Sequence, residues 1–395
     1  MDSIDGGAPR QRWLACGHSV GSDAFSAGAA ATREAIGDHD DVRLLIVFCS
    51  DSYDLPALVR GIASASGDAP LIGCSTAGEI ATAGPADASI VVTALGGPGF
   101  TVQIGAARGA SKDLRLAARD AVKSCVDGLE PRAHSVVLLL TDGLGGDQME
   151  IIRGAYEVVG AEIPLVGGCA GDDLKMQTTF QFFADEVLSD AVVAAAISSD
   201  APMGIGVQHG WRPVGDPMVV TASRGNRVEA LDDQPALDAY LRRLDAPPEA
   251  WHDADAFTRF ALTHPLGITR RSGAEVRFVA EPDYEDRSIV CIASVPQGGL
   301  AWIMEGDEDS VLEATNGACC EALAGLQGQS PIGLMAFDCI ARRGVLGEGI
   351  ATEINRIANY ADGAPVAGFY TYGEIARTTG RQGFHNQTLV VLALG

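Results

Sequence analysis

Basic residues are scarce in this chain of 395 residues, because 28 Lys and Arg stand against 52 Asp and Glu and leave a net charge of −24. Nucleic-acid binding depends on clustered Lys and Arg that neutralise phosphates, and the sequence contains no such cluster. An anionic membrane surface would repel the chain for the same reason. The composition therefore excludes nucleic acids and membranes from the expected partners.

Long hydrophobic segments are also missing. The strongest apolar run, residues 192–197, is far shorter than the roughly 18 residues that suggest a transmembrane helix. The N-terminal segment is acidic and has no apolar stretch, so a signal peptide is not expected. With 47% hydrophobic residues, the chain has enough apolar surface for two or three folded domains. We expect a cytoplasmic protein.

Cysteine pairs and common catalytic motifs are absent as well. The nine cysteines are scattered without a C-x-x-C motif, so we expect reduced thiols and no zinc site. The sequence has no Walker loop and no H-E-x-x-H motif. Ser75, Asp142 and His385 follow the chain order of α/β-hydrolases, but residues 73–78 have the form G-x-S-x-x-G and miss the nucleophile-elbow spacing. We expect a protein that is not an enzyme, with a hydrolase using Ser75 and His385 as the alternative.

One pattern occurs three times along the chain. An apolar run is followed by an acid, then by apolar residues at helical spacing, and then by proline and a second apolar run. The three copies cover residues 42–73, 135–167 and 332–368. Each copy predicts a strand, a helix and a parallel strand joined by a right-handed crossover.

A glycine-containing turn follows each copy. Residues 73–79 and 368–374 share two glycines and a final glutamate, whereas residues 167–173 end in two aspartates. A further strand is predicted after each turn, at residues 89–95, 191–197 and 388–394. Such turns lie at strand ends, where α/β sheets form ligand crevices. A tight turn with a hydrogen-bonded acid explains the pattern equally well.

These repeats predict an α/β protein with mixed, partly parallel sheets covered by helices, built from repeated β-α-β-(Gly turn)-β units. Residues 200–215 form a junction that contains several glycines and prolines. We therefore expect two domains, at residues 1–200 and 201–395. Part of the second domain is expected to be a β-meander, with strands near residues 219–222, 276–279 and 288–292 and a helix at 235–244.

Several motifs resemble the FIST family of sensory proteins. Residues 70–79, Pro-Leu-Ile-Gly-Cys-Ser-Thr-Ala-Gly-Glu, are similar to the signature of a FIST N-terminal module. Segments that resemble the FIST C-terminal module lie at residues 209–215, 220–221, 226–228, 231–236, 264–267, 339–342, 368–374 and 384–388. The resemblance covers nearly the whole chain and implies that residues 1–200 and 201–395 are a FIST N-terminal and a FIST C-terminal module.

The resemblance also implies a function. FIST modules are regarded as cytoplasmic sensors of small ligands that are coupled to signalling outputs. A stand-alone chain with two modules resembles the nitric-oxide-sensing branch, whose members are described as b-type haem proteins. This implies haem b as the cofactor, nitric oxide as the signal, and a histidine kinase or a cyclic-di-GMP enzyme as the partner that is regulated in trans.

Haem b needs an axial ligand, and three of the seven histidines lie in motifs of the resemblance: His209, His264 and His385. His385 is the preferred metal ligand, because it follows the turn at residues 373–374 closely and precedes the last strand; a structural histidine is the alternative. Cys339 is a further candidate, as a thiolate favoured by the nearby Arg342. The aromatic side chains of Tyr370 and Tyr372 are expected to line the pocket, or to belong to the core.

An amino acid or another polar metabolite is the alternative ligand. Glu79 and Glu374, in the turns that contain Gly78 and Gly373, would hold an ammonium group. Arg342 or Arg227 would bind a carboxylate through a bidentate fork. The same residues also fit purely structural roles, and the pattern alone does not choose between these possibilities. A crevice between the two domains is the natural place for the ligand.

Overall fold

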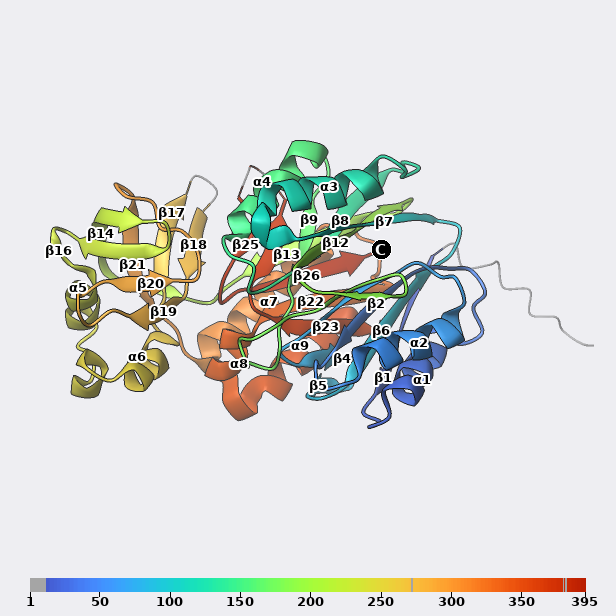
Figure 1. Cartoon of the computed structure of the whole chain (residues 1–395), viewed down its shortest axis with the longest axis horizontal. Helices are drawn as coiled ribbons and strands as arrows, with labels where there is room; N and C mark the ends of the chain where they lie inside the picture. The colour runs from blue at the N-terminus through green and yellow to red at the C-terminus, as the bar shows by residue number, and fades with distance from the viewer. Residues whose placement is uncertain (1–11, 271–272, 379, 381) are drawn as a thin grey trace, which may run out of the picture.

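The computed structural model describes residues 12–270, 273–378, 380 and 382–395. In this part of the chain, three mixed six-stranded sheets carry helices on their outer faces (Figure 1). A further sheet of eight strands belongs to a lobe at one end of the molecule. The observed architecture confirms the predicted α/β fold with mixed, helix-covered sheets.

The first unit shows how the repeat is built. Its elements are β1 (Trp13–Ser19), α1 (Ala24–Ile36), β2 (Val42–Cys49), α2 (Leu55–Ser66), β3 (Leu71–Ser75), β4 (Glu79–Ala81), β5 (Gly84–Ala86) and β6 (Ile90–Gly96). β2 and β3 are parallel, and their continuous apolar runs are buried on both faces. α1 and α2 begin after Asp23 and Asp54, whose carboxylates accept backbone N–H groups of the first turn.

The second unit repeats this order. Its elements are β7 (Phe100–Arg108), α3 (Leu114–Val126), β8 (His134–Thr141), α4 (Gln148–Val159), β9 (Leu165–Cys169), β10 (Gln181–Phe183), β11 (Glu186–Leu188) and β12 (Ala191–Ser199). The parallel pair is β8 and β9. The first strand and helix of these two units, β1–α1 and β7–α3, precede the repeat that was recognised in the sequence, so they were not predicted.

The third unit is interrupted by the lobe after its first strand. Its elements are β13 (Met203–Gln208), α7 (Glu308–Ala324), β22 (Gly333–Cys339), α8 (Ile340–Leu346), α9 (Ile350–Ala361), β23 (Val366–Thr371), β24 (Glu374–Arg377), β25 (Phe384–His385) and β26 (Leu389–Leu394). β22 and β23 are the parallel pair. The predicted domain boundary near residue 200 falls in the connection between β12 and β13, and the two-domain division stays a prediction.

Each glycine-containing turn leads into a short hairpin that joins the sheet of another unit. The hairpin β10–β11 pairs with β3, β24–β25 pairs with β9, and β4–β5 pairs with β23. Every unit therefore donates one hairpin and receives one, which closes a three-way exchange. This exchange brings the turns of different units together.

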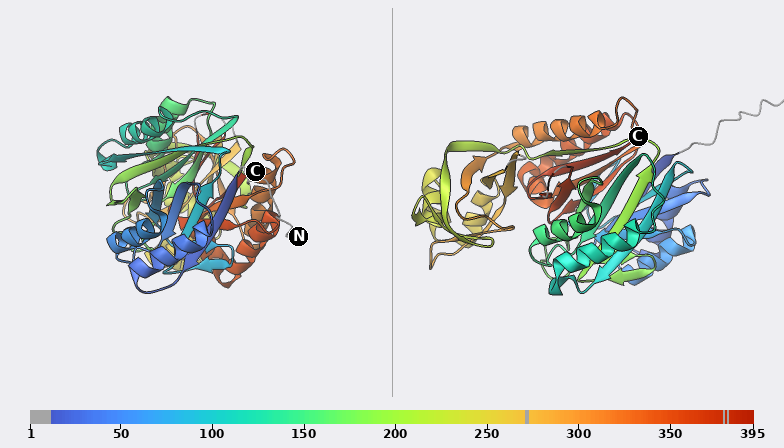
Figure 2. Two further views of the ribbon diagram at one scale, coloured as in Figure 1. Left: turned by 90° about the vertical axis from the view of Figure 1, so that its right-hand side faces the viewer. Right: turned by 90° about the horizontal axis from the view of Figure 1, so that it is seen from above.

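The inner faces of the three sheets share one hydrophobic core, and the helices cover the outer faces, as the end-on view in Figure 2 shows. Phe48 of β2 packs against Phe369 of β23 with ring centroids 4.6 Å apart, and Phe337 of β22 lies edge-on to both. Residues from all three units therefore meet at the centre, which explains why these strands are apolar throughout.

The lobe has its own core and is joined to the third unit by two chain crossings (Figure 2). Its elements are β14 (Arg212–Arg224), β15 (Arg227–Leu231), β16 (Gln234–Pro235), α5 (Ala236–Arg243), α6 (Ala254–Ala261), β17 (Leu266–Arg270), β18 (Gly273–Arg277), β19 (Val279–Pro282), β20 (Ile289–Cys291) and β21 (Leu300–Glu305). The outgoing strand β14 and the returning strand β21 are antiparallel neighbours. The predicted strands and helix of this region are present.

Candidate functional site

The turn glutamates Glu79 and Glu374 have matching surroundings. Oε1 of Glu79 accepts the Thr76 hydroxyl at 2.5 Å, and Oε2 accepts the backbone N–H of Ser89 at 3.1 Å. The carboxylate of Glu374 accepts the Thr371 hydroxyl at 2.7 Å and the backbone N–H of Thr388 at 3.1 Å. Each glutamate therefore connects its turn to the residue directly before a long strand, which is Ser89 before β6 and Thr388 before β26. The carboxylate oxygens of both glutamates thus accept hydrogen bonds from the protein itself.

The second unit carries a glutamine at the equivalent position. Gln181 is the first residue of β10, as Glu79 is of β4 and Glu374 of β24. Its Oε1 accepts the backbone N–H of Ala191, the first residue of β12, at 3.2 Å. A neutral amide therefore performs the same task, which supports a structural role for the two glutamates. The sequence comparison of the turns missed Gln181, because a longer loop separates it from Gly171.

Burial raises the pKa of both carboxyl groups. Burial raises the pKa of Glu79 from 4.5 to about 7, although the hydrogen bonds from Ser89 and Thr76 act in the opposite direction. The pKa of Glu374 is raised from 4.5 to about 8, for the same reason. A fully buried carboxyl group that is protonated near neutral pH is a poor partner for an ammonium ligand.

Arg342 lies at the centre of a buried polar cluster. Its Nε donates to Asp338 at 2.8 Å, and its Nη2 donates to Glu353 at 2.5 Å and to Thr315 at 3.1 Å. Nη1 donates to the backbone carbonyl of His209 at 3.0 Å. The guanidinium group, which the sequence suggested as a carboxylate fork for a ligand, therefore holds carboxylates of its own chain and fixes the start of the lobe connection.

Cys339 and Tyr370 are also buried. Burial, with the neighbouring carboxyl of Glu374, raises the pKa of Cys339 well above 9.0, so the residue is a thiol and not a thiolate. The guanidinium of Arg343 lies 4.8 Å from the ring centroid of Tyr370. Gly78 leaves room for this stack, because a Cβ atom there would lie 2.3 Å from Nη1 of Arg343.

The three candidate histidines each have a ring nitrogen in a hydrogen bond. Nε2 of His385 lies 3.0 Å from the carbonyl oxygen of Ala376, and Nδ1 of His209 accepts the backbone N–H of Trp211 at 3.0 Å. His264 belongs to the lobe, where its ring stacks on Phe260 and its Nδ1 lies 2.8 Å from the Phe260 carbonyl. One nitrogen of each ring therefore takes part in a hydrogen bond within the protein.

Charge surrounds two of these rings. Burial, together with the nearby Arg342 and His385, lowers the pKa of His209 to about 4. Burial also lowers the pKa of His385, whose neighbours include Glu275 and Arg277. These two residues form a buried ion pair at 2.8 Å. An axial haem ligand needs a free ring nitrogen facing an apolar slot, and the surroundings of His385 do not fit that requirement. Among the described residues, no group of three or more His, Cys, Asp or Glu is placed to hold a metal ion.

Ser75 is placed by backbone partners. Its hydroxyl donates to the carbonyl of Gly171 at 2.6 Å and accepts the N–H of Phe180 at 2.9 Å, which links β3 to the entry of the β10–β11 hairpin. Asp142 accepts the hydroxyl of Thr179 at 2.7 Å. His385 binds Ala376 instead. The three residues suggested for hydrolysis therefore serve three separate local structures.

A cavity of about 450 Å³ lies between the second unit and the lobe, and we call it the interlobe cavity. The residues that line it are Gly143, Leu144, Gly146, Asp147, Gln148, Gly225, Asn226, Ile292, Ala293, Ser294, Tyr372 and Phe384. Its floor is the loop between β8 and α4, and Asp147 caps α4 by accepting the N–H of Met149. The cavity lies at the carboxyl end of a parallel strand, where ligands of α/β sheets commonly bind.

Of the predicted site residues, Tyr372 lines the interlobe cavity, and its role in ligand binding stays a prediction. Its hydroxyl donates to Asp172 at 2.5 Å and accepts the backbone N–H of Leu174 at 2.8 Å. The glycine-rich loop at residues 142–147, Asp-Gly-Leu-Gly-Gly-Asp, was not singled out from the sequence, although its position between a predicted strand and helix is a recognisable signal.

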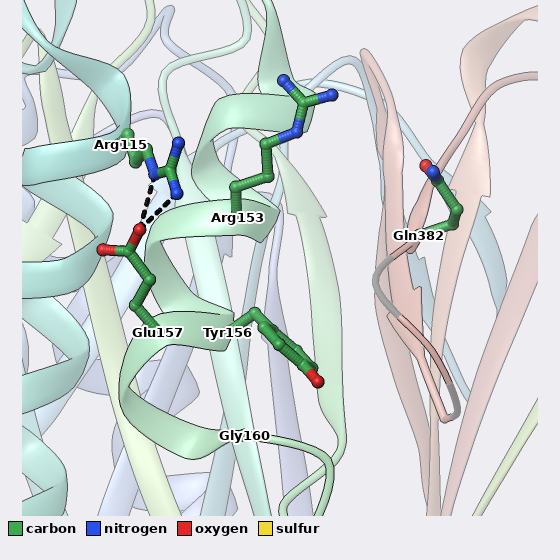
Figure 3. Close-up of a pocket in the computed structure, with 6 residues that line it drawn as sticks. All are labelled: Arg115, Arg153, Tyr156, Glu157, Gly160 and Gln382. Atoms are coloured by element: carbon green, nitrogen blue, oxygen red, sulfur yellow. Dashed lines mark hydrogen bonds and ion pairs between the residues drawn. The ribbon is translucent and has the colours of Figure 1, made fainter.

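A second hollow of about 760 Å³ lies on the outer face of the second unit, and we call it the outer groove (Figure 3). It is lined by Arg115, Arg153, Tyr156, Glu157, Gly160 and Gln382. α3, α4 and the β24–β25 hairpin of the third unit supply these residues. None of these described lining residues was predicted from the sequence.

Comparison with known families agrees with the motifs. Residues 43–234 match the model of the FIST N domain, and residues 236–377 match the model of the FIST C domain. The chain contains both FIST domains. FIST domains are of a sensory type, which suggests a signalling or sensor role for this FIST protein.

Two relatives of this FIST protein are described as uncharacterized proteins. A protein of Mycobacterium tuberculosis is 24% identical over 375 residues, which covers 92% of this chain and 94% of the relative. A protein of Methanocaldococcus jannaschii is 26% identical over 202 residues, which is 48% of this chain and 38% of the relative. The chain thus spans well under half the length of the archaeal relative.

The crystal structure of a cyanuric acid hydrolase from A. caulinodans aligns with 49% of this FIST protein and with 72% of its own chain, at 14% identity and a TM-score of 0.28. An overlap this low supports no statement about function. In the described part of the chain, no helix has the length and apolar character needed to cross a membrane.

The interlobe cavity lies where the two FIST domains meet. The lining residues from Gly143 to Gln148, with Gly225 and Asn226, belong to the segment that matches the FIST N domain. Residues 292–294 and Tyr372 belong to the segment that matches the FIST C domain. Both domains therefore contribute to the lining of this cavity.

Proposed function

We propose that this FIST protein is a cytoplasmic sensor that binds an amino acid or a similar small polar metabolite in the interlobe cavity. The observation that carries the proposal is the cavity itself, because both FIST domains line it. Its volume of about 450 Å³ falls in the range of small-molecule sites. Closure of the lobe on a ligand would convert binding into a change of domain position.

The lining suits a zwitterion. The loop that precedes α4 contributes glycine backbone, whose N–H groups can donate to a carboxylate. Asp147 lies in the same wall and supplies a carboxylate for an ammonium group. Leu144, Ile292 and Phe384 supply apolar surface for the rest of the ligand. A small molecule with both charges and an apolar part matches these groups.

Binding and not catalysis is the activity that we propose for the chain. The buried Ser75 hydroxyl is engaged by Gly171 and Phe180, and the buried carboxyls of Glu79 and Glu374 are engaged by their own turns. Ester hydrolysis that is lost in Ser75→Ala but kept in Ser223→Ala, a change in β14 of the lobe, would contradict this proposal.

A thermal-shift screen of the free amino acids, followed by calorimetry, tests the proposed ligand. A ligand at 100 times its Kd stabilises the folded state by about 2.7 kcal/mol, which raises the melting temperature measurably. Asp147→Asn should weaken binding about tenfold, because asparagine keeps the helix cap but removes the charge that faces the ammonium group.

Ile292→Trp should fill the cavity and abolish binding. Its matched control is Leu300→Trp, since both residues are exposed aliphatic side chains of the lobe, at 39% and 42%, and Leu300 is not among the residues that line the cavity. Binding that survives Ile292→Trp, or is lost equally in Leu300→Trp, would place the ligand elsewhere.

Haem b and nitric oxide sensing stay predictions of the family resemblance. Expression with haem supply, followed by an absorption spectrum of the reduced protein, tests them. A Soret band that is lost in His385→Ala, together with a screen that finds no amino acid, would replace the metabolite proposal by the haem sensor. We also propose, on the same resemblance, a histidine kinase or a cyclic-di-GMP enzyme as the partner. Kinase autophosphorylation or cyclic-di-GMP turnover with and without this protein measures that effect.

A further inference from the structure

The connection between β9 and β10 contains a loop, at residues 172–178, that is fixed by hydrogen bonds. The buried carboxylate of Asp172 accepts the backbone N–H groups of Met176, Gln177 and Thr178 at 3.0, 2.6 and 3.0 Å. One side chain thus binds three consecutive N–H groups, which gives the loop a defined course although its residues form neither helix nor strand. We call it the 172–178 loop.

Side chains of the first unit also hold this loop. The hydroxyl of Ser50 donates to the carboxylate of Asp173 at 2.7 Å. Nζ of Lys175 donates to the two carboxylate oxygens of Asp51 at 2.6 and 2.7 Å. Ser50 and Asp51 directly follow β2, so a loop that leaves the second unit is fastened to the end of a strand of the first.

The 172–178 loop exposes two large apolar side chains. Leu174 is 61% exposed and Met176 is 58% exposed, with one residue between them. Their φ angles of +63° and +54° lie in the left-handed region, which is costly for residues other than glycine. Single apolar residues are common on protein surfaces. Two that are presented together on a fixed and strained loop point to a surface that binds a partner.

The charges beside the apolar pair limit the kind of partner. The carboxylates of Asp51 and Asp173 outnumber the ammonium group of Lys175, and the whole chain has a net charge of −24. Nucleic acids and anionic membranes would be repelled by this surface. A protein with an apolar pocket and basic residues at the rim of that pocket is complementary to it.

One end of the loop is connected to the interlobe cavity through Tyr372, which lines the cavity. The Tyr372 hydroxyl donates to Asp172 at 2.5 Å and accepts the backbone N–H of Leu174 at 2.8 Å. The residue that meets the cavity therefore also holds the carboxylate that organises the loop and the backbone of an exposed apolar residue.

The other end is connected through Asp142. Its Oδ1 accepts the hydroxyl of Thr179, the residue after the loop, at 2.7 Å. The same oxygen accepts the backbone N–H of Leu144, which lines the interlobe cavity, at 2.9 Å. Both ends of the loop are thus hydrogen-bonded to residues in or next to the cavity wall.

We propose that the 172–178 loop is a docking surface for a partner protein, which receives Leu174 and Met176 in an apolar pocket with a basic rim. The link to a ligand rests on the proposed function, whereas the docking surface does not. A metabolite that contacts Tyr372 alters the hydrogen bonds that hold the loop, and with them the affinity for the partner.

Photo-crosslinking followed by calorimetry tests the docking surface. Leu174→p-benzoylphenylalanine, irradiated in the native cell, captures the partner, which is then identified, purified and titrated with the unmodified protein. Leu174→Ser and Met176→Ser should each weaken binding at least about tenfold, because both side chains are buried in the complex. Added salt should weaken binding as well. The control is Leu116→Ser, a 40% exposed residue of α3, which should leave the affinity unchanged.

Three results would overturn the docking surface. They are the absence of any cross-linked protein, cross-links to a second copy of this chain alone, and a captured protein that binds both serine variants as tightly as wild type. Binding that does not respond to salt would overturn the basic rim.

Hydrogen exchange tests the link to the cavity. Tyr372→Phe removes the hydroxyl that contacts Asp172 and Leu174, so the amides of residues 174–178 should exchange at least about tenfold faster. The control is Tyr284→Phe, which removes a hydroxyl bound to the Ala250 carbonyl in the lobe and should leave the loop unchanged. Equal exchange of the loop in Tyr372→Phe and wild type would overturn the link.

The docking surface and the metabolite site can fail separately. Asp147→Asn, which should weaken the metabolite, should leave the affinity for the purified partner unchanged when no amino acid is added. A thermal-shift screen without a hit would remove the metabolite proposal and leave the docking surface in place. Loss of docking in Asp147→Asn without any amino acid would show that the partner binds at the interlobe cavity, which would overturn the docking surface.

Discussion

Replacing Glu374 by glutamine should stabilise this protein at neutral pH, although the carboxyl group is fully buried and hydrogen-bonded. The second unit already uses Gln181 at the equivalent position to accept a backbone N–H. A glutamine at position 374 keeps an acceptor for the N–H of Thr388. Its amide group can donate to the Thr371 hydroxyl, which also accepts.

The magnitude follows from the pKa of Glu374, which burial raises from 4.5 to about 8. Between these pH values the folded protein keeps a proton that the unfolded chain has released, so the free energy of unfolding falls as the pH rises. At pH 7, about 2.5 pH units above the unfolded-state pKa, this costs about 3 kcal/mol. The glutamine variant carries no such cost.

Urea unfolding at pH 5, 6, 7 and 8 measures the effect. Wild type and Glu374→Gln should have similar stability at pH 5, and the variant should gain steadily up to pH 8. Glu79→Gln should show the same trend with a plateau near pH 7, because burial raises that pKa to about 7. Glu281→Gln, on the exposed side of β19, is the control and should not alter the pH dependence. A gain that is the same at every pH, or a variant less stable than wild type at pH 8, would refute the reasoning.

Three further changes probe the buried polar groups and the strained backbone by urea unfolding. Arg342→Met should lower the free energy of unfolding by about 3–5 kcal/mol, because it leaves the Asp338 and Glu353 carboxyls unpaired in the core. The control is Arg212→Ala, which removes an exposed ion pair and should cost less than about 1 kcal/mol. Gly78→Ala should lower the free energy of unfolding by at least about 1–3 kcal/mol, because φ at this position is +119° and the new Cβ would collide with Arg343. An unchanged free energy of unfolding would contradict the stacked position of the Arg343 guanidinium. Met176→Gly should stabilise the protein by about 1 kcal/mol, because the residue is 58% exposed and has a φ of +54°; destabilisation would show that its side chain has a partner.

The strand–helix–strand units were predictable because their signals are local. The runs at residues 44–48, 136–140 and 334–337 are apolar at every position, as strands covered on both faces must be. The glycine-containing turns were predictable for a similar reason, since glycine and threonine at fixed spacing fit one turn geometry. The leading strand and helix of each unit were missed, because small residues such as those of α1 give a weak periodic signal.

The candidate site depended on contacts that no local pattern contains. Arg342 looked like a ligand fork, but its carboxylate partner Glu353 comes from another helix and is brought close only by packing. His385 was predicted as an axial ligand, and that role stays a prediction; the contact of its ring with the carbonyl of Ala376 comes from hairpin pairing, which no local pattern contains. Tyr372 lines the interlobe cavity together with residues from distant segments of the chain.

By itself, the sequence determined the α/β class, the repeated units, the acidic surface and the FIST modules, because these follow from composition and short-range spacing. Only the tertiary structure decided where the exchanged hairpins go and which residues meet in the interlobe cavity and the outer groove. The hairpin strands have two to four residues, too few to select a sheet through their own hydrogen bonds. Their destination is set by the packing of three whole units around one core, and the interlobe cavity depends on that packing.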